Sequence, residues 1–409
     1  MNAQTEKVLI GVTGRMDSAV AAYLLKKQGF DVHAVAVLFH DQTVNENDES
    51  LRIDKEIVQY GLSDLTKVKK IFDHLEIPFY AVNAQDQYYA QVHDPVVAHR
   101  LMGKAYNAKV TATNLLFEIL CQKAEVLKAK FVATGHYAKL QKNQKTKESS
   151  LFSSPDLSSD QSFLLAGLSS EQLGKLTLPL SDMRKVETVK IAKIMTVDME
   201  ESVKHTNVFE RVTLGDEIEG FIPSKMIIEG EVYLRHDDSM ITEHKGVHNF
   251  FLGQGAESGL DLKKTGNERD LVVVEINPKS GSIYVEEPKR LYFTHVALAS
   301  CSFGGGSNSV FPIDVHVQFK EFGDRYVAKL YFKNNNTCVL DFNTQQVGMI
   351  PIGTSAVVYS KASGISRVVA SGVVQDCFHM IKGHARRFAP VTDEENEEIE
   401  QSLKNQMGF

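Results

Sequence analysis

The 409-residue chain is longer than one hydrophobic core usually serves, and its hydrophobic and charged contents, 43% and 24%, are those of a globular protein. These values exclude a disordered or fibrous chain. The formal net charge of -7 excludes a strong overall attraction to nucleic acid but leaves room for a local basic surface. No apolar run approaches the roughly 18 residues of a membrane span, and the polar N-terminus lacks a signal-peptide pattern, so we expect a cytoplasmic protein with no membrane partner.

In the first half of the chain, β-branched apolar runs alternate with helical patterns. The expected strands are 8–12, 32–39, 79–83 and 130–134, and the expected helices are 17–28, 64–75 and 112–129. Apolar runs without alternation are typical of strands buried on both faces, with the helices as crossovers. The sequence therefore predicts a doubly wound, parallel α/β domain over residues 1–200. Within it, the polar stretch 141–159 is expected to be a mobile loop.

The second half of the chain contains short strand candidates separated by Gly, Asn and Pro turns. Those at 225–228, 231–234, 271–276 and 282–285 predict a small central domain over residues 201–288. Six more, at 293–299, 313–319, 325–332, 337–342, 355–360 and 367–374, are regularly spaced. This spacing predicts a six-stranded antiparallel β-barrel over 289–385. Residues 386–409 are expected to form a charged helical tail.

The first expected strand leads into a loop at which a helix begins. Its residues are Gly11, Val12, Thr13, Gly14, Arg15, Met16, Asp17 and Ser18. Such a loop exposes unpaired N–H groups at the positive end of a helix and can hold phosphate oxygens. The simpler explanation, favoured on spacing alone, is that Thr13 or Asp17 only caps the helix. The loop is neither a Walker A motif nor a Rossmann fingerprint.

Several motifs, in order along the chain, resemble those of one enzyme family. The loop is similar to the S-G-G-x-D-S pyrophosphate loop of the ATP pyrophosphatases, and A-T-G-H-Y-A at 133–138 reproduces a signature of the tRNA-specific 2-thiouridylases. Further similar segments are S-D-Q-S-F-L-L at 159–165, L-P-L-S-D at 178–182 and H-K-G-V-H-N-F-F-L-G-Q at 244–254. The chain is therefore identified as a divergent member of this family.

The resemblance implies a pyrophosphatase domain, a small central domain and a β-barrel, in agreement with the three blocks above. It also implies that ATP, with Mg²⁺, adenylates the wobble uridine of a tRNA, and that a cysteine persulfide then delivers sulfur. The implied ATP site comprises the loop 11–18, the backbone around Val37, and Gly135. The implied RNA-facing residues are Asn107, His136, Asp160 and Gln161. For His136, the alternative is an ordinary satisfied loop residue.

The two cysteines that carry this chemistry in the family have no counterpart here. T-P-N-P-x-x-L-C-N aligns with 105–113, where Ala112 replaces the cysteine, and E-S-Q-x-I-C-F aligns with 201–207, where Thr206 replaces it. Sulfur transfer requires a thiolate that can carry a persulfide, so the two-cysteine mechanism cannot run. Cys121 lies in an apolar run and is more simply a structural thiol. Without C-x-x-C pairs, we also expect no tightly bound metal.

Two further departures affect phosphate and RNA binding. Arg15 replaces the second glycine of S-G-G, so its side chain either crowds the phosphates or pairs with them; we expect obstruction. In the barrel, the family's basic R-Y-R, which contacts tRNA, corresponds to H-V-Q at 316–318, and its P-G-Q turn to I-G-T at 352–354. We therefore expect weak tRNA binding with a shallow salt dependence.

Three functions remain compatible with the sequence. The first is a tRNA-binding protein that uses ATP to activate a base without a cysteine pair. The second is a non-catalytic relative that holds tRNA or a sulfur-relay protein. The third is a conventional 2-thiouridylase, of the sulfurtransferase class, in which Cys121 is recruited. Whether the chain is an enzyme, which RNA it binds and its oligomeric state are left open, and DNA is not an expected partner.

Overall fold

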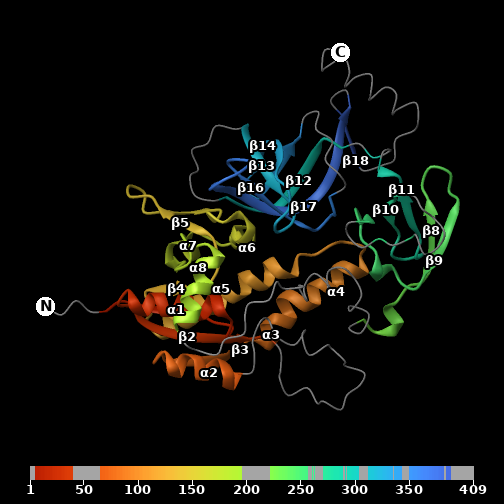
Figure 1. The fold of residues 1–409 in the computed structure, drawn as a ribbon. Coiled ribbons are helices and arrows are strands. Elements are labelled where there is room, and N and C mark those ends of the chain that lie inside the picture. Colours follow the sequence, from red (N-terminus) through yellow and green to blue (C-terminus); the bar gives the residue numbers. More distant parts are fainter. Residues whose placement is uncertain are drawn as a thin grey trace.

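The computed structural model describes residues 5–39, 65–195, 222–256, 260, 262, 270–288, 291, 293–303, 312–334, 336–342, 350–381 and 384–387. Figure 1 shows a parallel sheet with helices on both faces, a barrel packed beside it, and a second, smaller sheet next to both. Within these residues, no helix is long and apolar enough to cross a membrane.

The first sheet is parallel and has the strand order β3-β2-β1-β4-β7. Its strands are β1 (Lys7–Gly11), β2 (Asp31–Leu38), β3 (Phe79–Asn83), β4 (Phe131–Ala133) and β7 (Leu176–Thr177). Both faces are buried: Val8 and Ile10 enter one core, and Leu9 enters the other. Apolar runs without alternation had predicted this burial, and the doubly wound class is confirmed. The short edge strand β7 was not predicted.

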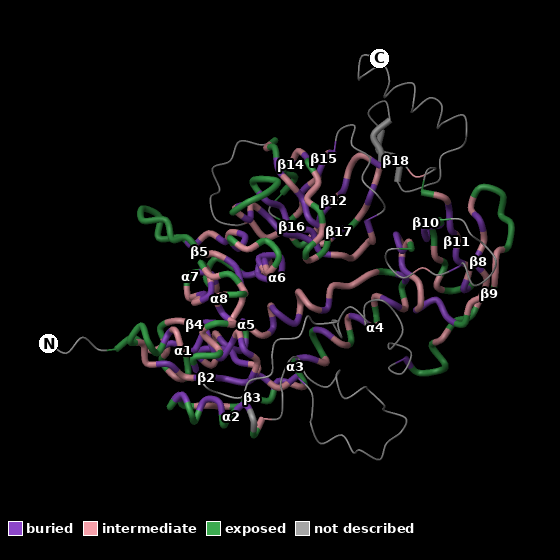
Figure 2. Tube along the Cα trace, viewed as in Figure 1, coloured by how far each residue is buried: buried purple, intermediate pink, exposed green. Residues whose placement is uncertain are grey.

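Helices cover each face of this sheet. α1 (Met16–Lys27) and α2 (Leu65–His74) pack on the Val8 side, whereas α5 (Ala108–Val126) packs on the Leu9 side. The remaining helical segments are α3 (Gln85–Tyr88), a π-helical turn (Tyr89–His93), α4 (Asp94–Leu101), α6 (Ser162–Leu165), α7 (Ser170–Lys175) and α8 (Lys185–Ile194). Figure 2 shows that the exposed residues of this layer gather on the outer surfaces of the helices and in the turns.

The polar stretch 141–159 is not an irregular loop, and that expectation is corrected. It contributes to a hairpin of β5 (Lys139–Lys142) and β6 (Ser149–Phe152), followed by a short 3-10 helix (Leu157–Ser159). The exposed tip of the hairpin is polar, but Leu151 is buried in the core that contains α5. Phe152 also forms an antiparallel bridge with Arg367 of the barrel. Pairing within the hairpin, together with one bridge to the barrel, therefore orders a segment whose composition indicates a loop.

The central sheet has the order β10-β11-β8-β9. Its strands are β8 (Gly230–Leu234), β9 (Met240–His244), β10 (Val272–Ile276) and β11 (Ile283–Glu286). Three of them were expected and β9 was not. The strand expected at 225–228 is wrong: a 3-10 turn (Ser224–Met226) occupies this region and directs the chain into β8.

The C-terminal sheet closes on itself through the pairing of β12 with β17, which confirms the six-stranded antiparallel barrel. The strands are β12 (His295–Phe303), β13 (Ile313–Gln318), β14 (Tyr326–Asn334), β15 (Thr337–Asp341), β16 (Ser355–Tyr359) and β17 (Val368–Ile381). An additional strand, β18 (His384–Arg387), pairs with the end of β17 and was not expected. The helix predicted beyond it lies outside the described residues.

Segments of all three parts meet at one junction through backbone hydrogen bonds. Leu252 N–H donates to Gly103 O (2.8 Å), Ile352 N–H to Leu252 O (3.1 Å) and Ala105 N–H to Ile352 O (2.9 Å). Gly353 adopts φ 96°, and a Cβ there would meet the Ala105 carbonyl oxygen at 2.0 Å. Glycine is therefore required in the 352–354 turn because two backbones approach too closely for a side chain.

Candidate functional site

The strand order reverses between β1 and β4, so the carboxyl ends of these two strands form the topological switch point of the sheet. Ligands bind at such points in doubly wound folds. The structure brings the loop 11–18, which follows β1, and the segment 134–137, which follows β4, to this edge of the sheet. Two motifs more than a hundred residues apart in the sequence thus form one candidate site.

The loop is held in a preformed conformation by its own residues. Ser18 Oγ accepts from the Thr13 N–H (3.2 Å) and donates to the Arg15 carbonyl (3.0 Å). Gly14 has φ 78°, a conformation that favours glycine. Arg15 precedes α1 with φ -90° and ψ 162°, which any residue adopts. The backbone therefore does not require glycine at position 15, and a conflict with phosphate would involve only the Arg15 side chain.

Gly135 lets the β4 segment approach the first turn of α1. A Cβ at this position would lie 2.8 Å from both the Asp17 carbonyl carbon and the Ser18 nitrogen. The β4 segment therefore lies directly beside the first turn of α1, where the N–H groups of a helix start can bind an anion. The A-T-G-H-Y-A motif thus requires glycine at position 135 because any side chain there would collide with the backbone of α1, which the sequence alone does not reveal.

The carboxylate of Asp17 is already partnered. Lys185 Nζ, from the first turn of α8, donates to its two oxygens at 2.7 and 2.5 Å, and the Tyr137 hydroxyl donates to Oδ1 at 2.7 Å. The Tyr137 oxygen accepts a second hydrogen bond from the Thr188 hydroxyl (2.9 Å), because its single hydrogen is donated to Asp17. Burial and, secondarily, the charge of Asp17 raise the pKa of Tyr137, so its hydroxyl remains a donor. Lys185, Tyr137 and Thr188 were not singled out from the sequence, and only Tyr137 lay within a quoted motif.

His136 is partly buried beside this cluster. One ring nitrogen, Nδ1, lies 2.9 Å from Thr134 Oγ1. Burial first, and then the positive charge of Lys109, lower the pKa of His136 to about 4, against the opposing effect of Asp17. The imidazole is consequently neutral near pH 7 and can donate or accept a hydrogen bond without carrying charge.

The position expected to align with the first family cysteine lies on α5. Ala112 is buried, and Asn107 caps this helix by accepting the Val110 N–H (3.1 Å). Cys121 lies nine residues further on, about 13 Å along the axis and half a turn around it. Burial raises the pKa of its thiol. Thr206 lies outside the described residues.

The remaining expected residues are buried or partly buried. Val37 is buried on β2. Gln161 Oε1 accepts the Tyr137 N–H (3.0 Å), and the Gln161 N–H donates to the Tyr137 carbonyl (2.8 Å). Asp160 is buried and accepts hydrogen bonds from its own domain. Direct contact of Asn107, His136, Asp160 or Gln161 with RNA stays a prediction.

The residues fit a nucleoside triphosphate in their chemistry. The helix start supplies N–H donors, Gly135 adds no side chain beside them, and Lys185 adds a cation. Among the described residues, no group of three or more His, Cys, Asp or Glu side chains is arranged to hold a metal ion. Asp17 is a carboxylate of the loop itself, which suits the sharing of a divalent cation with phosphate oxygens.

Comparison with known proteins gives a consistent assignment. The family described as "tRNA methyl transferase HUP domain" matches residues 6–208. The tRNA-specific 2-thiouridylase of Clostridioides difficile is 26% identical over 374 residues, covering 90% of this chain and 98% of that protein. A second such enzyme, from Geobacillus kaustophilus, is 26% identical over 377 residues, covering 90% and 96%.

Among solved structures, a 4-thiouridine synthetase in complex with RNA and ATP covers 47% of this chain and 41% of that one. The two are 18% identical with a TM-score of 0.32, a similarity too low to inform function.

Proposed function

The chain belongs to the family of the tRNA-specific 2-thiouridylases, and from this premise we propose that it binds tRNA and ATP without transferring sulfur through a cysteine pair. The observation that carries the proposal is the preformed loop 11–18 at the switch point of the sheet, with Gly135 packed against the first turn of α1. The buried Ala112 of α5 stands where the family's first cysteine aligns. The binding elements are retained, whereas the thiol chemistry is lost.

In this proposal the nucleotide phosphates lie against the N-terminus of α1. The loop N–H groups donate to phosphate oxygens, and Lys185 supplies positive charge next to Asp17. Bound ATP would supply the activating group for a base oxygen. His136, kept neutral by burial, would offer a hydrogen bond to the base without adding charge.

The recruitment of Cys121 as a replacement nucleophile is disfavoured by geometry. On a straight helix it points away from the side on which Ala112 lies, and its raised pKa leaves little of the reactive thiolate. Cys301, Cys338 and Cys377 belong to the barrel strands. We therefore expect Cys121→Ser to leave nucleotide and RNA binding unchanged.

Calorimetric titration with magnesium and ATP tests the first half of the proposal, and release of pyrophosphate on addition of bulk tRNA tests the second. Binding together with tRNA-dependent release supports base activation. Absence of ATP binding would refute it and favour a non-catalytic module that holds tRNA or a sulfur-relay protein. A tRNA-thiolation activity that Cys121→Ser abolishes would refute the proposed function, because it would show that Cys121 transfers sulfur.

The strength of tRNA binding provides a separate test. Few basic contacts are expected in the barrel, and each lost phosphate contact lowers the slope of log affinity against log salt by about 0.7 to 0.9. We expect weak binding with a shallow slope. A tight complex at physiological salt with a steep slope would contradict this expectation.

A further inference from the structure

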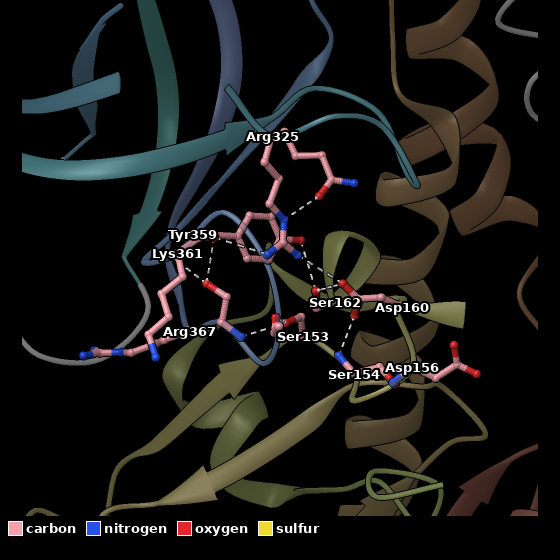
Figure 3. A network of polar contacts seen from close by, with 12 residues as sticks. Ser153, Ser154, Asp156, Asp160, Ser162, Arg325, Tyr359, Lys361 and Arg367 are labelled. Atoms are coloured by element: carbon pink, nitrogen blue, oxygen red, sulfur yellow. Dashed lines mark hydrogen bonds and ion pairs between the residues drawn. The ribbon is translucent and has the colours of Figure 1, made fainter. Parts of the chain in front are cut away.

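A polar network joins the barrel to the α/β layer, and Arg325 lies at its centre (Figure 3). Arg325 precedes β14, and its guanidinium carbon lies 3.6 Å from the centre of the Tyr359 ring on β16. Its Nη2 faces Asp160 Oδ2 at 3.5 Å, and its Nε donates to Gln318 Oε1 at 3.3 Å. Both charged side chains are only 9% exposed, so water screens their attraction weakly.

On the α/β side, Asp160 accepts hydrogen bonds from Ser154 and Ser162. Oδ1 accepts from the N–H groups of Ser154 (2.8 Å) and Ser162 (3.1 Å), and Oδ2 accepts from the Ser162 hydroxyl (2.9 Å). The Ser162 hydroxyl also lies 3.0 Å from the Tyr359 hydroxyl. Burial raises the pKa of this carboxyl, and the hydrogen bonds from Ser154 and Ser162, followed by the charge of Arg325, oppose the rise. Within the described part of the chain, Arg325 of the barrel is the only cation that forms an ion pair with Asp160.

The same segment reaches the phosphate loop through the next residue. Gln161 makes two hydrogen bonds to the backbone of Tyr137, one in each direction (2.8 and 3.0 Å). The Tyr137 hydroxyl in turn donates to Asp17 (2.7 Å). A continuous series of direct contacts therefore runs from Arg325 to Asp17 in the candidate nucleotide site.

We propose that Arg325 is a positioning residue, which holds the phosphate loop in its binding conformation by anchoring Asp160 and Gln161 against Tyr137. The barrel and the nucleotide site are then coupled: a change that moves Arg325 shifts the affinity at the loop. By thermodynamic linkage, nucleotide binding shifts the barrel to the same extent. The inference rests on the proposed nucleotide site, but the coupling between Arg325 and the loop can be measured by hydrogen exchange without any nucleotide.

The test compares Arg325→Gln, Asp160→Asn and the double variant with the unmodified chain. Lys361→Met is a matched control, because it removes an exposed barrel cation at the same interface. Lys361 contacts Arg325 through its backbone carbonyl, which the substitution retains. Hydrogen–deuterium exchange of peptides covering residues 11–18 and 135–137 reports on the loop without ligand. Calorimetric titration with magnesium and ATP reports on affinity.

We expect Arg325→Gln to speed exchange in both peptides while leaving β3 (79–83) unchanged, and to weaken ATP binding about fivefold, within the usual range of coupling through packed networks. Lys361→Met should do neither. Because Arg325 acts through Asp160, the effects of the two substitutions should not add in the double variant. Arg325→Lys should restore little, since lysine lacks the planar group that stacks on Tyr359.

Each outcome distinguishes the two proposals. If the unmodified chain does not bind ATP, the proposed function fails, and the exchange data alone decide the coupling. Exchange that is unchanged in Arg325→Gln, or that rises equally in β3, would overturn the inference. Additive effects on affinity would also overturn it, because they would mean that Arg325 and Asp160 act separately.

Discussion

Arg100 is a charged side chain enclosed in the structure, and its replacement by methionine should stabilise the protein. The residue lies on α4, is fully buried, and none of its three guanidinium nitrogens has a hydrogen-bond partner within the part of the chain that the structure describes. Its one favourable polar contact among the described residues is with the face of the Phe251 ring, 4.8 Å from the guanidinium carbon. A buried cation in this position costs free energy that an apolar side chain would not.

The magnitude follows from the pKa. Burial lowers the pKa of Arg100 from 12.5 to about 10, and at about 1.36 kcal/mol per pKa unit the charged form is disfavoured by about 3 kcal/mol. The cation–π contact offsets about 2 kcal/mol of this cost. Methionine has a similar length and recovers about 1 kcal/mol through its sulfur–aromatic contact. We therefore expect Arg100→Met to raise the free energy of unfolding by about 1–2 kcal/mol.

Urea unfolding followed by circular dichroism measures the change, with Lys190→Met as the control. Lys190 is an exposed cation on α8, so its replacement should alter stability by less than about 0.5 kcal/mol. A loss of more than about 1 kcal/mol in Arg100→Met would refute the reasoning. It would mean that the guanidinium has a partner of compensating strength in the native protein.

Three further predictions concern the candidate site and the barrel. The pKa of His136 is about 4 in the folded protein and 6.5 unperturbed, so the unfolded chain binds more protons between these values. Acidification from pH 7 to about pH 5 should therefore lower the free energy of unfolding by about 2 kcal/mol, and His136→Gln should abolish this loss when urea unfolding is compared at the two pH values. Arg15→Gly should strengthen binding of magnesium and ATP in calorimetry, because the substitution clears the N-terminus of α1. Cys301 and Cys338, whose sulfurs lie 3.5 Å apart on neighbouring strands, should form a disulfide with the oxidant diamide, lowering the thiol count of the denatured protein from four to two.

The contrary results are equally specific. Identical acid sensitivity of His136→Gln and the unmodified chain would mean that the ring titrates normally. Weaker binding by Arg15→Gly would show that the guanidinium pairs with phosphate, which favours an ATP-using enzyme. An unchanged thiol count, with Cys301→Ser as the control, would mean that the two strands keep the sulfurs apart.

The sequence by itself determined the fold class and most strands of the parallel sheet and the barrel, because these depend on local patterns. The apolar run at 32–39 predicts a strand buried on both faces, and β2 is one. The regular spacing of short strands predicts a closed antiparallel sheet, and β12 to β17 form it. The residues around Gly135 and Ser18 were identified as a candidate site from motifs, and the strand order brings them together.

Tertiary structure alone decided which charges meet. Lys185 is 168 residues from Asp17, and Arg325 is 165 residues from Asp160, so no periodicity or spacing links either pair. Composition likewise indicated a loop at 141–159, where pairing within the hairpin and with the barrel produces strands. The physical reason is the same in each case: the energy of an ion pair or of a strand pairing depends on a partner that only the folded chain brings near.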